Sequence, residues 1–149
     1  CCRAARGATA YTRRQETLMA ALDTNVVVRL IVGDHAAQAR AAEALVASEP
    51  CTVAPSVLME CEWVLRACYE LDAKLIGASF RDLLALQNID PLEPVLTEKA
   101  LDGYQAGLDF ADALHAAQRR EGASFATFDK PLVRRAPKAG LSGVVLLSS

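Results

Sequence analysis

The chain has 149 residues, the length of one domain that is large enough to bury a hydrophobic core. Hydrophobic residues make up 52% of the chain but aromatic residues only 5%. This balance favours helices packed on an aliphatic sheet over a β-sandwich. The wholly apolar runs are far shorter than the roughly 18 to 20 residues that span a bilayer. The composition therefore predicts a soluble protein and excludes a membrane-spanning one.

The first 18 residues differ from the rest of the chain. They begin without Met, carry four Arg against one Glu, and contain no apolar segment of the kind a secretory signal needs. We expect residues 1–18 to be a non-native or disordered basic extension, and residues 19–149 to form a single domain that begins at Met19. Without the extension the formal charge changes from −2 to −5, and an acidic domain is not an obvious nucleic-acid binder by charge alone.

The strands and helices alternate along the chain. Strands are predicted at residues 17–22, 51–54, 89–93, 124–127 and 144–147. Helices are predicted at residues 24–32, 35–48, 55–69, 72–86, 97–106 and 109–120. We expect Ser56 to cap the third helix and Gly122 to end the last one. Such alternation predicts an α/β fold with a central, mainly parallel sheet of about five short strands and helices on both faces.

The five cysteines contain no C-x-x-C pair, and their number is odd. The odd number, and the position of two of them within predicted core segments, indicate reduced thiols in a cytoplasmic protein. As small buried hydrophobic residues, the cysteines need no further function. They are Cys1, Cys2, Cys51, Cys61 and Cys68.

Four acidic residues interrupt apolar segments: Asp23, Glu60, Asp112 and Asp129. Acids are rarely buried without a partner, and few cationic side chains lie near these four in the sequence. Ligands in parallel α/β folds bind outside the carboxyl ends of the strands, so we expect the four acids to converge on one rim. A hard divalent cation such as Mg²⁺ or Mn²⁺ is the natural partner of such a cluster, and phosphodiester hydrolysis is its usual chemistry.

Each acid also has a purely structural interpretation. Asp23 can cap the first helix, and Asp129 can begin a turn. Glu60 competes with Glu62, which lies on another helix face. We expect Glu60 to face the core side, because Leu58, Cys61 and Leu65 bracket it, and Glu62 to pair outward with Arg66.

Asp109 and Asp112 share a helix face at the spacing of a cap and its reciprocal partner. For Asp109 we favour the capping role and keep it only as a secondary metal ligand. His115, three residues after Asp112, is expected to be a partly buried helix residue.

Six basic residues lie within twenty residues of one another near the carboxyl end. They can form a basic strip beside the acids, as a phosphate backbone requires, or they can be a solvated helix face. They are Arg119, Arg120, Lys130, Arg134, Arg135 and Lys138.

The acidic motifs, taken in order, resemble those of the PIN-domain ribonucleases, and among them the VapC toxins of bacterial toxin–antitoxin modules. The motifs are LDTNVVVRL at residues 22–30, VLMECEWVL at 57–65, GLDFADALH at 107–115 and FATFD at 125–129. The resemblance extends over residues 19–147. It implies a PIN-like fold and a Mg²⁺- or Mn²⁺-dependent endoribonuclease with an acidic cluster of Asp23, Glu60, Asp112 and Asp129.

On this interpretation Asp23, Asp112 and Asp129 are direct metal ligands, and Glu60 holds a metal-bound water or a second ion. The resemblance also implies an RNA substrate and a small antitoxin protein that blocks the site. Two alternatives stay open: a non-catalytic acidic module that binds a basic partner protein, and a metal-dependent RNA-processing nuclease outside a toxin–antitoxin module. The apolar surfaces of residues 57–69 and 71–86 further predict a homodimer.

Overall fold

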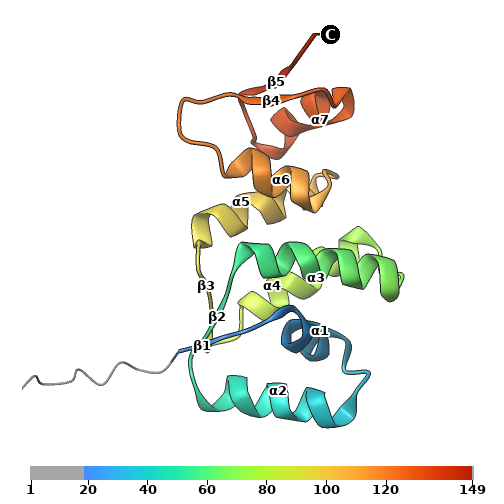
Figure 1. Ribbon diagram of the computed structural model, residues 1–149, viewed down its shortest axis with the longest axis vertical. Coiled ribbons are helices and arrows are strands. Elements are labelled where there is room, and N and C mark those ends of the chain that lie inside the picture. Colours follow the sequence, from blue (N-terminus) through green and yellow to red (C-terminus); the bar gives the residue numbers. More distant parts are fainter. Residues whose placement is uncertain (1–18, 149) are drawn as a thin grey trace, which may run out of the picture.

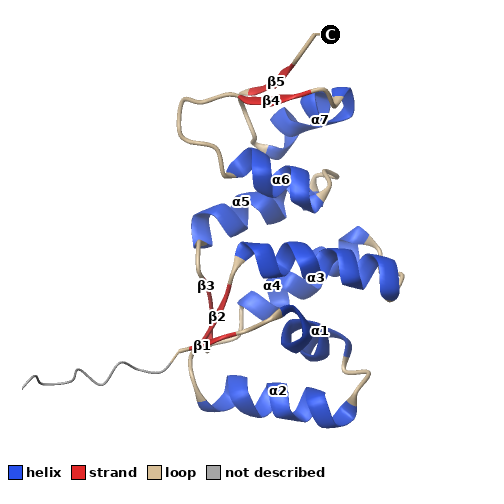
Figure 2. Ribbon diagram, viewed as in Figure 1, coloured by secondary structure: helices blue, strands red, loops and turns tan. Residues whose placement is uncertain are grey.

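The structure is a computed structural model that describes residues 19–148 (Figure 1). The predicted basic extension and the first residues of the predicted 17–22 strand lie outside this range. Within it, short strands alternate with helices, and helices make up most of the molecule (Figure 2). The elements are β1 (Ala20–Ala21), α1 (Thr24–Val32), α2 (Ala36–Ser48), β2 (Cys51–Val53), α3 (Pro55–Cys68), α4 (Ala73–Leu84), β3 (Ile89–Pro91), α5 (Pro94–Gln105), α6 (Phe110–Ala117), β4 (Phe125–Thr127), α7 (Lys130–Arg135), the 3₁₀ turn η1 (Ala136–Ala139) and β5 (Val144–Leu146).

The predicted α/β class with parallel strands is confirmed, but the strands are divided between two sheets. One sheet has the order β1-β2-β3 and the other pairs β4 with β5, and every pairing is parallel. In Figure 1 the two sheets lie far apart along the longest axis, with α5 and α6 between them. The expectation of one central sheet is therefore corrected. Within the described residues β1 pairs only with β2 and is an edge strand.

Most helices begin where a polar side chain accepts from a backbone N–H of the first turn. Asp23 caps α1, His35 caps α2, Asp72 caps α4 and Asp109 caps α6. Gly33 ends α1 in the left-handed conformation, with φ at 68°, and its N–H donates to the carbonyl of Arg29.

Two predicted helix ends are wrong. Ser56 does not cap α3, because the helix already begins at Pro55, whose missing N–H needs no partner in the first turn. Gly122 does not end α6, which stops at Ala117. There the Arg119 side chain folds back and donates to the carbonyls of Ala116 and Ala123.

The predicted elements missed α7 and η1, and α5 begins three residues earlier than expected, at Pro94. Proline near the start of each of these elements explains both differences, since its fixed φ is already helical. No helix in the part of the chain that the structure describes is long and apolar enough to cross a membrane.

Two hydrophobic clusters hold the molecule together. The larger one joins the β1-β2-β3 sheet to the six helices α1 to α6, and contains the buried rings of Phe80, Tyr104 and Phe110. Phe110 meets both other rings edge to face, with centroid separations of 5.8 Å to Phe80 and 5.4 Å to Tyr104. The smaller cluster lies between α6, α7 and η1 and includes Leu132 and Leu141.

Candidate active site

Asp23 and Glu60 lie together at the carboxyl end of β1. The chain leaves the strand through the buried Leu22, and Asp23 then caps α1 by accepting from the Val26 N–H at 2.9 Å. On the neighbouring helix α3, Glu60 accepts from the Thr24 hydroxyl at 2.6 Å. The first turn of α1 thus ties the two predicted acids, which are far apart in the sequence, into one group.

A buried thiol lies close enough to both carboxylates for their charges to affect its pKa. Cys61 lies beneath them, and its Sγ donates to the Thr24 carbonyl at 3.6 Å. Burial, followed by the charges of Glu60 and Asp23, raises the pKa of Cys61 to about 12. Cys61 is therefore a neutral, inert thiol at physiological pH, as the cysteine pattern predicts.

A second group of acids forms around the start of α6. Asp109 caps this helix, accepting from the N–H groups of Ala111 at 2.9 Å and Asp112 at 3.4 Å. Asp129 caps α7, accepting from the Leu132 N–H at 3.0 Å. Burial raises the pKa of the half-buried Asp112, and the charges of Asp109 and then Asp129 raise it further. The negative charges of Asp109 and Asp129 thus disfavour ionisation of Asp112.

His115 acts in the opposite direction and lowers the pKa of Asp112. The side chain is exposed rather than partly buried as the sequence suggests. It lies one turn after Asp112 on the outer surface of α6, where the helix C-terminus favours positive charge.

The structure does not gather all four predicted acids at one rim. Asp23 and Glu60 belong to the larger sheet and its helices, whereas Asp112 and Asp129 belong to α6 and the end of β4. A surface pocket of about 670 Å³ connects the groups, because Glu60 and Asp109 both line it. We call it the α3–α6 pocket; its other lining residues are Ser56, Met59, Glu62, Trp63, Arg66 and Ala111.

Carboxylate oxygens are the donors that Mg²⁺ and Mn²⁺ prefer, so the chemistry of the predicted residues fits such an ion. Their placement does not fit such an ion, because residues 19–148 contain no group of three or more His, Cys, Asp or Glu that could hold a metal ion. The arrangement therefore presents two separate carboxylate groups rather than one assembled metal centre.

The orientation of α3 is the reverse of the predicted one. Glu62 faces the core, with 4% of its surface exposed, whereas Glu60 is exposed. Glu62 accepts from the Tyr104 hydroxyl at 3.0 Å and from Arg66 Nε at 2.8 Å. Tyr104 comes from α5, 42 residues away, so the sequence near α3 contains no sign of the partner that lets Glu62 be buried. Glu60 lies on the surface beside Asp23, where it accepts from the Thr24 hydroxyl.

The basic residues of the carboxyl end do not act as one strip. Arg119 is committed to backbone carbonyls, and Arg135 donates to the Gly107 carbonyl at 3.3 Å. The other four are exposed and make no ion pair within residues 19–148. Lys130 directly follows Asp129 in the chain, and Arg66 of α3 lines the α3–α6 pocket together with Glu60 and Asp109.

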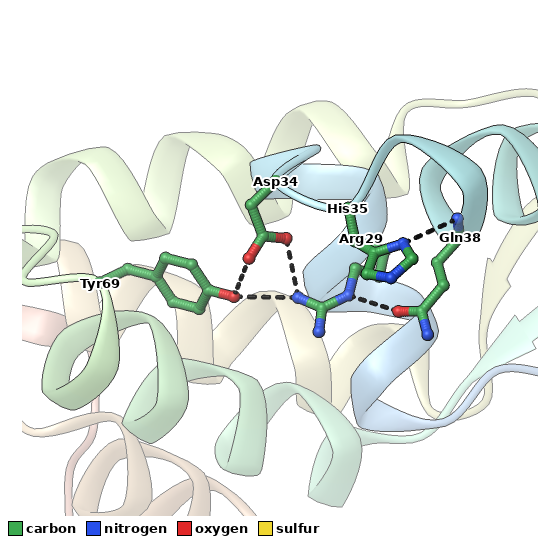
Figure 3. A network of polar contacts seen from close by, with 5 residues as sticks. All are labelled: Arg29, Asp34, His35, Gln38 and Tyr69. Atoms are coloured by element: carbon green, nitrogen blue, oxygen red, sulfur yellow. Dashed lines mark hydrogen bonds and ion pairs between the residues drawn. The ribbon is translucent and has the colours of Figure 1, made fainter.

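Sequence reasoning missed a polar network that begins four residues after Asn25, at Arg29 (Figure 3). Arg29 Nη1 donates to Asp34 Oδ1 at 2.8 Å and to the Tyr69 hydroxyl oxygen at 2.9 Å, and Nε donates to Gln38 Oε1 at 2.8 Å. The hydrogen bond from Tyr69 is the largest influence that lowers the pKa of Asp34. The sequence does contain a sign of this network, because Arg29 is the only charged residue between Val26 and Val32.

The comparisons with known proteins agree with the acidic motifs. The model of the PIN domain family matches residues 20–138, which is most of the chain. No curated protein and no solved structure gives a significant match. The chain belongs to the PIN-domain family, whose members are generally nucleases and typically use divalent metal ions.

Proposed function

We propose that this PIN-domain protein is a toxin-type endoribonuclease that hydrolyses RNA phosphodiester bonds and is inhibited by a cognate antitoxin. The acids that we assign to cleavage are Asp23, Glu60, Asp112 and Asp129, with Asp109 as a secondary ligand. The ion that we expect to be required is Mg²⁺ or Mn²⁺, because hard divalent cations take carboxylate oxygens.

The observation that carries the proposal is the pattern of ion pairs. Among residues 19–148 the acids in ion pairs are Asp34, Glu62, Glu98 and Asp102. None of the five acids of the candidate site is among them. Other acids of residues 19–148 also lack an ion pair, but the site acids differ from them in lying together: Asp23 with Glu60, and Asp112 with Asp109 and Asp129. Neighbouring carboxylates without an ion pair are expected of a site that serves an external cation and its substrate.

The α3–α6 pocket supports an extended substrate. It runs from Glu60 on α3 to Asp109 at the start of α6. A single RNA strand lying in it would pass both carboxylate groups. The exposed Trp63 indole at the pocket offers a surface on which a base can stack.

Incubation of the purified chain with total RNA tests the proposal. We expect new RNA ends in Mg²⁺ or Mn²⁺, and none in the presence of a chelator; sequencing of the ends then gives the cleavage sites. Asp23→Asn and Asp112→Asn should each abolish this cleavage, because an amide cannot replace the carboxylate charge.

The matched control is Asp82→Asn, which changes an exposed Asp on α4 outside both carboxylate groups. It should cleave like the wild type. Cleavage that continues in chelator, or that survives both Asp23→Asn and Asp112→Asn, would contradict the proposal. Binding of a basic peptide without any RNA cleavage would instead favour the acidic binding module.

An antitoxin that presents a cationic side chain suits the same pocket. Glu60 and Asp109 give it negative charge, and Met59 and Trp63 give it apolar contact area. An arginine-containing peptide can therefore satisfy both the charge and the apolar surface. We expect such a peptide to compete with RNA for the wild type and to bind Glu60→Gln more weakly; equal affinity for both proteins would contradict this site.

We also propose a homodimer formed through α4. Leu75 and Leu86 are 50% and 46% exposed and lie on or beside this helix. Large apolar side chains of this kind are common at interfaces. Light scattering at micromolar concentration should give the mass of a dimer for the wild type and of a monomer for Leu75→Lys, and a wild-type monomer would contradict self-association.

A further inference from the structure

A second pocket lies between α1 and α2 and begins at Asp23. It has a volume of about 510 Å³, large enough for one nucleotide. Its apolar wall is made by Val26, Ala42 and Leu45, and its polar edge by Asn25, Arg29 and Gln38. We call it the α1–α2 pocket. Neither the acidic motifs nor the family match assigns it a role.

The guanidinium of Arg29 is fixed at the edge of this pocket. Asp34 and Tyr69 hold Nη1, and Gln38 holds Nε (Figure 3). The side chain is only 22% exposed, so little freedom remains for it to lose when a ligand binds. Nη2 makes no hydrogen bond to any residue between 19 and 148, and Figure 3 shows it free of the network.

Gln38 offers a second free donor beside the first. Its Oε1 is occupied by Arg29 Nε, and its Nε2 makes no hydrogen bond within the described part of the chain. His35 accepts from the Gln38 backbone N–H and so fixes the first turn of α2. The pocket edge therefore presents two neighbouring donor groups, Arg29 Nη2 and Gln38 Nε2.

The charge of the pocket favours a base over a phosphate. Asp34 neutralises Arg29 through a 2.8 Å ion pair, and Asp23 adds a negative charge at the other end. A phosphate would meet no net positive charge there. A nucleobase can instead lie against the apolar wall and direct an edge with two acceptors at the two donors.

We infer that the α1–α2 pocket binds the base next to the scissile phosphate and selects a base with two adjacent acceptors through Arg29 and Gln38. Guanine has this edge at O6 and N7, and cytosine has it at O2 and N3. Adenine places a donor beside N7, and the uracil carbonyls flank a donor, so neither matches. The inference rests on the proposed cleavage of RNA and adds to it a nucleotide preference.

The test measures binding apart from cleavage. The Asp112→Asn protein is titrated, in chelator, into labelled hexamers of adenosine that carry one guanosine, cytidine or uridine, and fluorescence anisotropy gives the affinities. Either the guanosine or the cytidine hexamer should bind at least about fivefold more tightly than the all-adenosine hexamer, the lower end for one paired base contact. The result also distinguishes guanine from cytosine.

The same titration of a Gln38→Leu, Asp112→Asn double variant should lose this preference, because leucine removes one donor while keeping the apolar surface. A Gln87→Leu, Asp112→Asn control changes an exposed Gln after α4, outside the α1–α2 pocket, and should keep it. Arg29→Lys in the same background should also lose the preference.

Equal affinity for all four hexamers, or a preference that survives Gln38→Leu, would overturn the inference. Neither result depends on whether the wild type cleaves RNA. A base preference in these titrations together with absence of cleavage would contradict the proposed function but leave the base-binding pocket standing.

Discussion

The two parallel sheets of this protein are built alike but are supported very differently. The β1-β2-β3 sheet packs into a cluster of large buried side chains from six helices, α1 to α6. The β4-β5 sheet packs against a small cluster in which half of the six buried residues are alanine. Beside it Phe128, Val145, Leu146 and Leu147 stay 68%, 39%, 44% and 44% exposed.

This difference bears on how each half of the candidate site is held. Asp23 and Glu60 are joined to each other through Thr24 and lie on the well-packed sheet and helices. Asp129 depends on a two-stranded sheet, and two strands alone are marginally stable in water. We therefore expect the first carboxylate pair to be the more rigid of the two groups.

The largest effect should come from Phe110→Ala, which removes a ring that is 1% exposed and packs against Phe80 and Tyr104. The expected loss is about 3–5 kcal/mol in the free energy of unfolding, measured by urea denaturation. Phe128→Ala is the matched control, since that ring is exposed, and it should change stability by less than about 0.5 kcal/mol. Equal losses would mean that Phe128 is buried against something else in solution.

Leu132→Ala should cost less, about 2 kcal/mol, which is the lower end for a buried leucine, because the surrounding cluster is small. Hydrogen exchange should show faster exchange in β4, β5 and α7, with the amides of β2 unchanged. Loss of protection in β2 to the same extent would show that the two sheets unfold as one unit and would remove the contrast between them.

A smaller loss of stability is expected when Asp109, the N-cap of α6, is replaced at the boundary of the two regions. Asp109→Ala should cost about 0.5–2 kcal/mol, because the N–H groups of Ala111 and Asp112 lose their acceptor. Asp109→Asn should cost little and keep most of the cleavage activity, whereas Asp112→Asn should lose activity. If Asp109→Asn silences cleavage as completely as Asp112→Asn, Asp109 is a ligand of equal importance.

The smallest effect concerns the charge on Asp112, whose pKa is raised by burial and by Asp109 and Asp129. A raised carboxyl pKa means that the folded protein binds this proton more tightly than the unfolded chain does. Ionisation of Asp112 therefore lowers the stability of the fold as the pH rises through its pKa in the unfolded chain and then its higher pKa in the folded protein. In chelator Asp112→Asn should melt at a higher temperature than the wild type at pH 7 and at the same temperature below the unfolded pKa of Asp.

A large drop in melting temperature for Asp112→Asn at neutral pH would assign the carboxylate a structural role instead. The same outcome for Asp23→Asn would extend that conclusion to the cap of α1, where asparagine is otherwise a good replacement.

The sequence by itself determined the local features: the short apolar strands, the acids that begin α1 and α6, and the resemblance of the ordered motifs to PIN domains. Each of these is encoded within one or two turns, where a side chain meets its own backbone. Cap residues such as Asp23 and Asp109 can therefore be identified from the order of the residues alone.

Only the tertiary structure decided which segments meet. The rotation of α3 that buries Glu62 and exposes Glu60 depends on Tyr104, 42 residues away, and the division of the strands into two sheets depends on which edges find partners. The α1–α2 pocket likewise needs Arg29 to meet Gln38 and Tyr69 across three helices. Such pairings are settled by packing and hydrogen bonding between distant parts of the chain, and no local pattern specifies them.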